Sequence, residues 1–311
     1  MDDTRLCQGI SELCDSYTGY IIDQWGVLHD GRRPYDGAIE ALKELKSRKK
    51  QVVILSNSGK RAEDNIRRLG NLGFDPSLFD HVLTSGEITW MGLKERKIGA
   101  FEGLGDACYL ISRGGDATLV DGLGLTLVDR PEDASFILVS GMDDPGTPGA
   151  RTVADLEPVL RVGVQRRLRM ICANPDLQAL IGASTHAGAG ALAMRYEEFG
   201  GVVRYIGKPF PPAFRHAQSL FHDVLPSTTV VIGDSLPMDI MGGINCGLDT
   251  CLVATGVHGA SFRGVKSRDD CHKVLRALGT NFGARPNFWI PKFHWGKVLL
   301  DRKNKRRQKR D

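Results

Sequence analysis

The sequence predicts an α/β fold: a doubly wound, Rossmann-like parallel sheet core with an inserted α/β cap domain. Short apolar runs alternate with amphipathic helical stretches along most of the 311 residues, which is typical of βαβ units. The alternation changes over residues 101–150, which are rich in Gly and Asp, and the core pattern resumes at about residue 202. We therefore expect a core formed by residues 1–86 plus 203–295, a cap domain inserted at 87–202, and a basic, disordered tail at 296–311.

The first part of the core is expected to contain three strands and two helices. The apolar run at 20–25 predicts the first strand. Asp36 can cap the N-terminus of a helix that extends to about Arg48, with Leu42 and Leu45 on one face. The further elements predicted here are a strand at 51–55, a helix at 61–72 that ends at Gly73, and a short strand at 81–83.

The remaining elements follow the same alternation. The strand at 250–254 is expected to be the last of the core sheet. In the inserted segment we predict strands at 107–111, 136–139 and 170–172, with helices at 153–167 and 189–199. After it we predict strands at 202–206 and 229–232, with helices at 213–224 and 238–245.

Composition is ordinary for a soluble globular protein, with 41% hydrophobic and 25% charged residues. No apolar run is long enough to span a bilayer, and the acidic start, Met1–Arg5, lacks the apolar segment of a signal peptide. The seven cysteines occur singly, with no CxxC pair, so neither a disulfide framework nor a structural zinc site is expected. These features favour a reducing, cytoplasmic location and no membrane partner.

The net charge of +4 is concentrated at the C-terminal end. Residues 301–311 hold seven Lys or Arg and two Asp, a charge of +5, which leaves −1 for the other 300 residues. Such a tail could bind nucleic acid or act as a targeting address. The preferred interpretation is a solvated, disordered terminus, so nucleic acid is not the expected partner.

Polar residues lie at, or just after, the C-terminal ends of four predicted core strands. Because the carboxyl ends of parallel strands meet at one edge of a sheet, these residues are expected to converge on a ligand. Their chemistry suits phosphoryl transfer, which depends mostly on positioning and charge stabilisation. Asp23 is the candidate nucleophile, Ser56 and Asn57 could donate to phosphate oxygens, Lys208 could neutralise charge, and Asp234 with Asp23 could hold Mg²⁺.

Four segments, in this order and at these spacings, resemble the motifs of the haloacid dehalogenase (HAD) superfamily. The inserted segment, with Cys-Ala-Asn-Pro-Asp at 172–176, resembles subfamily IIA, whose inserted domain is a C2-type cap. Residues 25–31 look like an uncharacterised IIA branch that also bears Trp at the second position after the nucleophile. The resemblance covers roughly residues 20–295. The four segments are Asp-Gln-Trp-Gly-Val-Leu at 23–28, Leu-Ser-Asn at 55–57, Gly-Lys-Pro at 207–209 and Gly-Asp-Ser-Leu-Pro-Met-Asp-Ile at 233–240.

The resemblance implies a role for each matching residue. Asp23 would be the nucleophile and a Mg²⁺ ligand, with Asp234 as a second ligand and the backbone carbonyl of Trp25 as a third. Asp239 would support the metal loop from behind. Asn174-Pro175-Asp176 could be a plain turn or a substrate-facing loop. The residues that would bind substrate are Ser56, Asn57, Lys208 and Asp176.

Trp25 departs from the general pattern of the superfamily. It stands where many members carry a carboxylate that protonates the leaving group and later activates water. General acid–base assistance of this kind is worth about 10²–10⁴-fold in rate. His29, Asp30 and Asp176 are candidates to replace it.

The resemblance implies a Mg²⁺-dependent HAD-type hydrolase, a phosphatase that acts on a small phosphorylated metabolite through an aspartyl-phosphate intermediate. The alternative is a phosphate-ligand binding pseudoenzyme with weak or no turnover, because Trp25 replaces the general acid and base. Caps of this subfamily often take part in dimers, so a homodimer through the cap is a further expectation.

Overall fold

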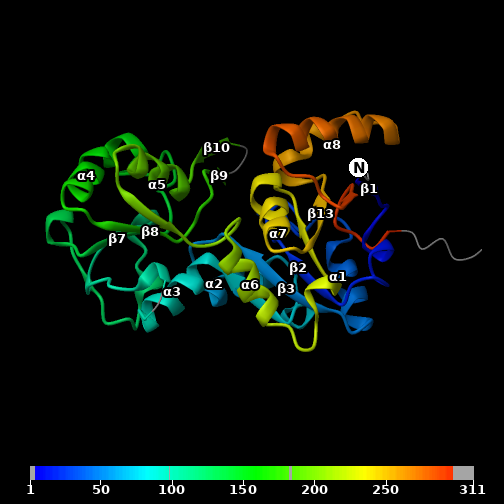
Figure 1. The fold of residues 1–311 in the computed structure, drawn as a ribbon, viewed down its shortest axis with the longest axis horizontal. Coiled ribbons are helices and arrows are strands. Elements are labelled where there is room, and N and C mark those ends of the chain that lie inside the picture. Colours follow the sequence, from blue (N-terminus) through cyan, green and yellow to red (C-terminus); the bar gives the residue numbers. More distant parts are fainter. Residues whose placement is uncertain (1–3, 98, 182–183, 297–311) are drawn as a thin grey trace, which may run out of the picture. The chain divides into compact units, whose positions relative to one another are not determined.

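The computed structural model describes residues 4–97, 99–181 and 184–296, which form two compact units (Figure 1). Within these residues, the first unit comprises the stretches up to Val52, from Leu72 to Asp80 and from Phe221 onward. The second unit comprises Val53–Asn71 and His81–Leu220.

The boundaries of these two units differ from the predicted domain boundaries. The second unit begins inside strand β3 (Gln51–Ser56) and includes β3 residues that the sequence assigns to the core. The predicted division into a core (1–86 and 203–295) and a cap (87–202) therefore stays a prediction. Apart from Gly296, the predicted tail lies outside the described residues.

The sheet of the first unit is parallel, and its strand order is β1-β14-β13-β12-β2. All four residues of β2 (Gly19–Ile22) are buried, as expected for a strand covered on both faces. β2 pairs with β12 (Thr229–Gly233) from Thr229 opposite Gly19 to Ile232 opposite Ile22. The backbone N–H of Asp23 continues this ladder to the carbonyl of Ile232 at 2.9 Å. The two strands therefore end side by side, and the residues that follow them are brought together.

The expectation that the strand at 250–254 is the last of the sheet is wrong. β13 (Asp249–Val253) pairs with β14 (Phe288–Ile290), which in turn pairs with β1 (Arg5–Leu6). Strands of two or three residues are too short to show a period of two, so the apolar pattern did not reveal them.

The helices of the first unit follow the sequence signals in part. α1 (Ala38–Ser47) was expected to be capped by Asp36, but it begins after Gly37, whose φ is 85°, and no side chain caps it. A single π turn (Leu236–Ile240) leads into α7 (Met241–Asn245) where one helix was predicted. α8 (Arg268–Phe282) begins at Ser267, whose side chain accepts a hydrogen bond from the N–H of Asp270. Its apolar face packs on β13 and the π turn through Cys271, Leu275, Leu278, Leu252 and Ile240.

In the second unit, β3 pairs in parallel with β4 (His81–Thr84), and α2 (Ala62–Asn71) connects them. α3 (Ser85–Glu95) follows directly, capped by the Thr84 hydroxyl, which accepts from the N–H of Glu87. The carboxylate of Glu87 also pairs with Arg61 at 2.7 Å and accepts from the N–H of Ala62 at 3.0 Å. The Arg61 guanidinium lies 3.8 Å from the centre of the Trp90 ring. This network fixes the start of α2 against α3.

A five-stranded parallel sheet, in the order β11-β8-β7-β5-β6, forms the rest of this unit. Its side chains alternate between two apolar clusters, as the pleat of a strand requires. One face, including Ile137 and Met170, packs against α4 and α5; the other, including Leu138 and Ile171, packs against α3 (Figure 1). The elements are β5 (Ala107–Ile111), β6 (Thr126–Leu127), β7 (Phe136–Val139), α4 (Val153–Gln165), β8 (Arg169–Cys172), α5 (Ala189–Glu198) and β11 (Val202–Tyr205).

Two smaller features complete the second unit. β9 (Gln178–Ile181) and β10 (Ser184–Ala187) form an antiparallel pair that the sequence analysis did not predict. α6 (Pro211–Ser219) ends five residues before the predicted end at 224. Among the described residues, no helix has the length and apolar character needed to cross a bilayer. The fold class is the predicted one: parallel α/β sheets covered by helices.

Candidate active site

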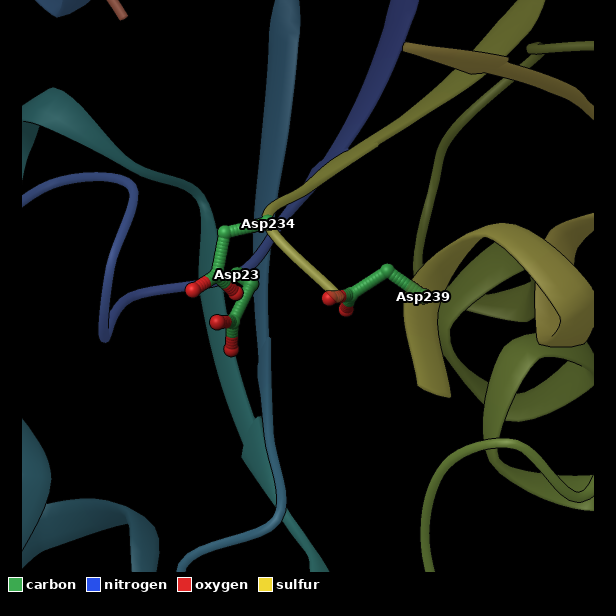
Figure 2. Close-up of side chains that lie close together, drawn as sticks. All are labelled: Asp23, Asp234 and Asp239. Carbon is green, nitrogen blue, oxygen red and sulfur yellow. The ribbon is translucent and has the colours of Figure 1, made fainter. Parts of the chain in front are cut away.

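Three carboxylates gather where β2 and β12 end (Figure 2). Asp23 follows β2, Asp234 follows β12, and Asp239 reaches the same place from the π turn. One oxygen of each lies within 4.8 Å of the others. The three residues are only 8%, 3% and 2% exposed. Like charges this close and this buried destabilise one another, and a divalent cation relieves that cost. A set of hard carboxylate oxygens fits Mg²⁺.

Asp234 is fixed by backbone groups from two other loops. One carboxylate oxygen, Oδ2, accepts a hydrogen bond from the N–H of Val257 at 2.7 Å. A Cβ added to Gly26 or to Gly256 would lie 2.0 Å or 1.8 Å from the same oxygen. Both glycines have positive φ, 79° and 65°, so neither the space nor the backbone conformation admits a side chain there. Sequence reasoning gave no role to Gly26, Gly256 or Val257.

Asp239 lies both in the acidic cluster and against the turn that carries Asp234. Its Oδ2 accepts from the N–H of Ser235 at 3.1 Å, so it holds the backbone immediately after Asp234. A Cβ on Gly233 would lie 2.1 Å from the Asp239 carboxyl carbon, which explains a glycine at the end of β12. This position agrees with the predicted supporting role, which itself stays a prediction.

The side chain of Trp25 packs on its own loop. Its ring meets that of His29 edge to face, with centroids 5.7 Å apart. A Cβ on Gly31 would lie 2.4 Å from Cζ2 of the indole. The predicted metal role of Trp25 concerns its backbone carbonyl and stays a prediction.

Two candidate substitutes for the missing acid stand on this loop. Asp30 is unsuited to donate a proton, because hydrogen bonds from the N–H groups of Arg32 and Arg33, both 2.9 Å, lower the pKa of its carboxyl. His29 is fully buried, and its Nδ1 accepts from the N–H of Gly31 at 3.0 Å. That contact requires Nδ1 to be unprotonated.

A second group of predicted site residues is joined within the second unit by Asn57. The Nδ2 of Asn57 donates to Oδ1 of Asp176 at 2.8 Å and to the carbonyl of Lys208 at 3.1 Å. Its Oδ1 accepts from the N–H of Lys208 at 2.7 Å and from the Ser85 hydroxyl at 3.2 Å. Asn57 and Lys208 are each 4% exposed. The structure therefore brings together three loops that the sequence could place only at strand ends.

Ser56 closes the same group. Its hydroxyl accepts from the N–H of Ser58 at 3.2 Å, and its carbonyl accepts from the Ser85 hydroxyl at 3.4 Å. Ser85 is fully buried and bonds both members of the Ser56-Asn57 pair. The sequence signal for Ser85 was its place in the Thr84-Ser85 pair after the predicted strand at 81–83, but no chemistry was assigned to it.

The loop that carries Asp176 is a hydrogen-bonded turn and also faces a predicted site residue. The N–H of Asp176 donates to Oδ1 of Asn174 at 3.1 Å, as in an Asx turn. The Asp176 carbonyl accepts from the N–H of Gly190 at 3.1 Å, and a Cβ on Gly188 would lie 2.2 Å from it. The backbone is thus pinned while the carboxylate meets Asn57. The structure therefore shows the turn, and a substrate-facing role of this loop stays a prediction.

Comparison with known proteins identifies the group to which these features belong. A family model for haloacid dehalogenase-like hydrolases matches residues 20–126, and a model for HAD-like hydrolases matches residues 205–275. The acid sugar phosphatase of Staphylococcus haemolyticus (strain JCSC1435) is 28% identical over 256 residues, which are 82% of this chain and 90% of that protein. The 5'-nucleotidase YutF of Bacillus subtilis (strain 168) is 29% identical over 245 residues, 78% of this chain and 89% of that protein.

A solved structure agrees in fold along nearly the whole chain. The crystal structure of a haloacid dehalogenase-like hydrolase from Brucella suis 1330 aligns with a TM-score of 0.75 and 26% identity. The alignment covers 92% of this chain and 99% of that one. Both matched segments carry acidic residues of the cluster, Asp23 in the first and Asp234 and Asp239 in the second. The chain belongs to the haloacid dehalogenase-like hydrolases.

Proposed function

We propose that this hydrolase is a Mg²⁺-dependent phosphatase that removes the phosphate group from a small phosphorylated metabolite. The observation that carries the proposal is the cluster of three buried carboxylates at the ends of β2 and β12. Asp23 would act as the nucleophile, and the set fits a hard divalent cation that would offset the charge of a phosphate.

In the proposed reaction, a carboxylate oxygen of Asp23 attacks the phosphorus atom. The bond from phosphorus to the substrate's ester oxygen breaks as the bond to Asp23 forms, giving an aspartyl-phosphate and an alcohol. Water then attacks the same phosphorus, releases inorganic phosphate and restores the Asp23 carboxylate. Bound Mg²⁺ would supply electrostatic stabilisation of the phosphoryl oxygens. Asp234 would hold the cation, and Asp239 would keep the Asp234 turn in place.

The group organised by Asn57 would bind the transferred phosphate. The Ser56 hydroxyl and the backbone around Asn57 would supply hydrogen-bond donors, and the buried residue Lys208 would supply a positive charge. The proposal is that these residues and Asp23 act on the same phosphoryl group. It is supported by the order of the four motifs along the chain and by membership of the family.

Proton transfer is the step that Trp25 changes. The departing alkoxide needs a proton, and the residue at position 25 has none to give. We propose that the enzyme is therefore slow on poor leaving groups and faster on good ones. His29 and Asp176 remain candidates for a replacement acid. Turnover and a pH profile that are unchanged in both His29→Ala and Asp176→Asn would exclude them.

The substrate class is proposed from the relatives. One is named an acid sugar phosphatase and another a 5'-nucleotidase, so a phosphate monoester of a sugar or of a nucleoside is the first class to test. We also propose a cytoplasmic location, supported by seven cysteines of which none forms a disulfide, and a homodimer formed through the C2-type cap of subfamily IIA.

Hydrolysis of p-nitrophenyl phosphate, with and without Mg²⁺, tests the proposal. We expect Mg²⁺-dependent turnover by the native chain, none by Asp23→Asn, and faster turnover by Trp25→Asp, which restores a carboxylate. Activity that survives Asp23→Asn would reject the assigned nucleophile.

The alternative is a protein that binds a phosphate ligand without useful turnover. The observation that favours it is the Trp25 side chain, which packs against His29 and Gly31 and supplies no acid. This alternative predicts that, in the same assay, the native chain does not hydrolyse p-nitrophenyl phosphate and that Trp25→Asp does.

A further inference from the structure

The segment that follows β13 contacts both loops that carry the acidic cluster. The hydroxyl of Thr255 donates to the carbonyl of Gly26 at 2.5 Å, and the N–H of Val257 donates to Asp234. The Nε2 of His258, a buried residue, accepts from the N–H of Leu236, two residues after Asp234. Three residues of one segment, Thr255, Val257 and His258, therefore contact the loop after β2 and the turn after β12.

Where Gly26 and Gly256 meet, the two backbones touch with no side chain between them. A Cβ on Gly256 would lie 2.7 Å from the Cα of Gly26, and Asp234 Oδ2 lies against both glycines. The side chain of Val257 is 60% exposed, so this residue acts through its N–H. Packing without side chains leaves hydrogen bonds as the means of fixing the orientation of the Gly26 peptides.

Gly26 is held from both sides. Its N–H donates to the carbonyl of His29 at 3.0 Å, and its carbonyl accepts from Thr255. In a trans peptide the C=O and N–H point in opposite directions, so the first bond also sets the direction of the Trp25 carbonyl. Gly26 has a φ of 79°, and a glycine can adopt many backbone conformations. Each of the two hydrogen bonds restricts the conformations open to Gly26.

We propose that Thr255 is a positioning residue for the cation site: its hydroxyl fixes the Gly26–Val27 peptide, which limits rotation at Gly26 and so helps to orient the Trp25 carbonyl and to hold the glycine surface against Asp234. This inference rests on the proposed function, in which Asp23, Asp234 and the Trp25 carbonyl hold Mg²⁺. Because the side chain at position 25 is not a ligand, the contribution of this loop to the cation comes from backbone. The orientation of that backbone is set by His29 within the loop and by Thr255 from outside it.

Two substitutions separate the hydrogen bond from the shape of the side chain. Thr255→Val keeps the branched shape and removes the donor, whereas Thr255→Ser keeps the donor and removes a methyl group. Thr280→Val is the matched control, because the exposed Thr280 hydroxyl also donates to a backbone carbonyl, that of Arg276 in α8 at 3.0 Å. Thermal unfolding without Mg²⁺ checks that each variant is folded.

The measurement is Mg²⁺ binding by isothermal titration calorimetry on the full chain, without substrate. Loss of a residue that orients a metal ligand typically weakens metal binding 10–100-fold, so we expect about tenfold weaker binding for Thr255→Val. Thr255→Ser and Thr280→Val should stay close to the native affinity. A parallel titration follows the rise in thermal unfolding temperature with Mg²⁺ concentration.

The outcomes are distinct. Native affinity in Thr255→Val would overturn the inference while leaving the proposed metal site intact, and equal losses in Thr255→Val and Thr255→Ser would assign the effect to packing and overturn it too. No Mg²⁺ binding by the native chain would overturn the proposed metal site and this inference with it.

Discussion

Asn57 donates a hydrogen bond to the carboxylate of Asp176 at 2.8 Å, across 119 residues of sequence. The same amide group exchanges two hydrogen bonds with the backbone of Lys208. Its oxygen and nitrogen therefore have assigned partners, and its orientation is fixed by them. Asp176 accepts this hydrogen bond, so a positioning role agrees better with its contact than the donation of a proton does.

Replacing Asp176 tests that role. Asp176→Ala removes the acceptor for Asn57, and we expect about tenfold weaker inhibition by inorganic phosphate, the scale of one hydrogen bond to a charged group. Asp176→Asn keeps an acceptor oxygen and should retain most of the binding and the native pH profile of kcat/KM. A proton donor must be protonated to act, so activity falls on the alkaline side of the profile as the donor loses its proton. Loss of that alkaline limb in Asp176→Asn would instead identify Asp176 as the proton donor.

Asp23→Asn is expected to have opposite effects on turnover and on stability. Hydrolysis should fall by at least about 10³-fold, because the amide is a poor nucleophile. Without Mg²⁺ the variant should unfold at a higher temperature than the native chain, since one of three buried like charges is gone. Thermal unfolding in EDTA measures this. A lower unfolding temperature would contradict the view that the acidic cluster is strained without a cation.

Gly256 and Gly247 form a pair for testing the packing on Asp234. Both have positive φ, 65° and 69°, so alanine brings similar backbone strain at either site, about 1 kcal/mol. A Cβ at Gly256 would also meet Asp234 Oδ2, whereas nothing lies within 4 Å of one at Gly247. We expect Gly256→Ala alone to lose Mg²⁺ binding in calorimetry. Equal Mg²⁺ affinities in the two variants would contradict the proposed close packing.

The pairing of Glu87 with Arg61 should make stability depend on pH. Burial raises the pKa of the Glu87 carboxyl, but hydrogen bonds from Arg61 and from the N–H of Ala62 outweigh it, so the pKa is below its ordinary value of 4.5. A depressed pKa means that the ionised group stabilises the fold above pH 4.5 and that this contribution is lost as the pH falls through the lower value. Glu87→Gln should therefore lower the free energy of unfolding by about 1–2 kcal/mol at pH 7.

Urea denaturation at several pH values measures this difference. It should shrink as the pH falls from 4.5 through the lowered pKa of the native carboxyl, below which that carboxyl is neutral too. A difference that stays constant from pH 7 to pH 3 would assign the loss to packing rather than to charge.

Much of the fold was predictable because its signals are local. The strands at 107–111 and 136–139 lie where the sequence predicts them, since buried runs of four or five apolar residues are bounded by polar turns. β1 and β14 were missed as strands because two or three residues carry no periodicity. The prediction that Asp36 caps α1 was wrong because the N-cap position is occupied by the next residue, Gly37.

The candidate site divides in the same way. Asp23, Asn57, Lys208 and Asp234 were singled out as candidates from their places after apolar runs. Ser85, Thr255 and Gly256 were not given a role, although the structure puts them in contact with those residues. A lone Ser, Thr or Gly after a strand is too common for the sequence to single it out.

The sequence by itself determined that this is a parallel α/β protein with carboxylates at its strand ends, because apolar periodicity and strand ends are local properties of the chain. Only the tertiary structure decided which groups those carboxylates meet. The bond from Thr255 to Gly26 joins residues 229 apart, and that from Asn57 to Asp176 joins residues 119 apart. Contacts of this kind depend on how distant segments pack. The sequence pattern does not show which backbone N–H donates to a distant side chain, or which glycine has no space for a side chain.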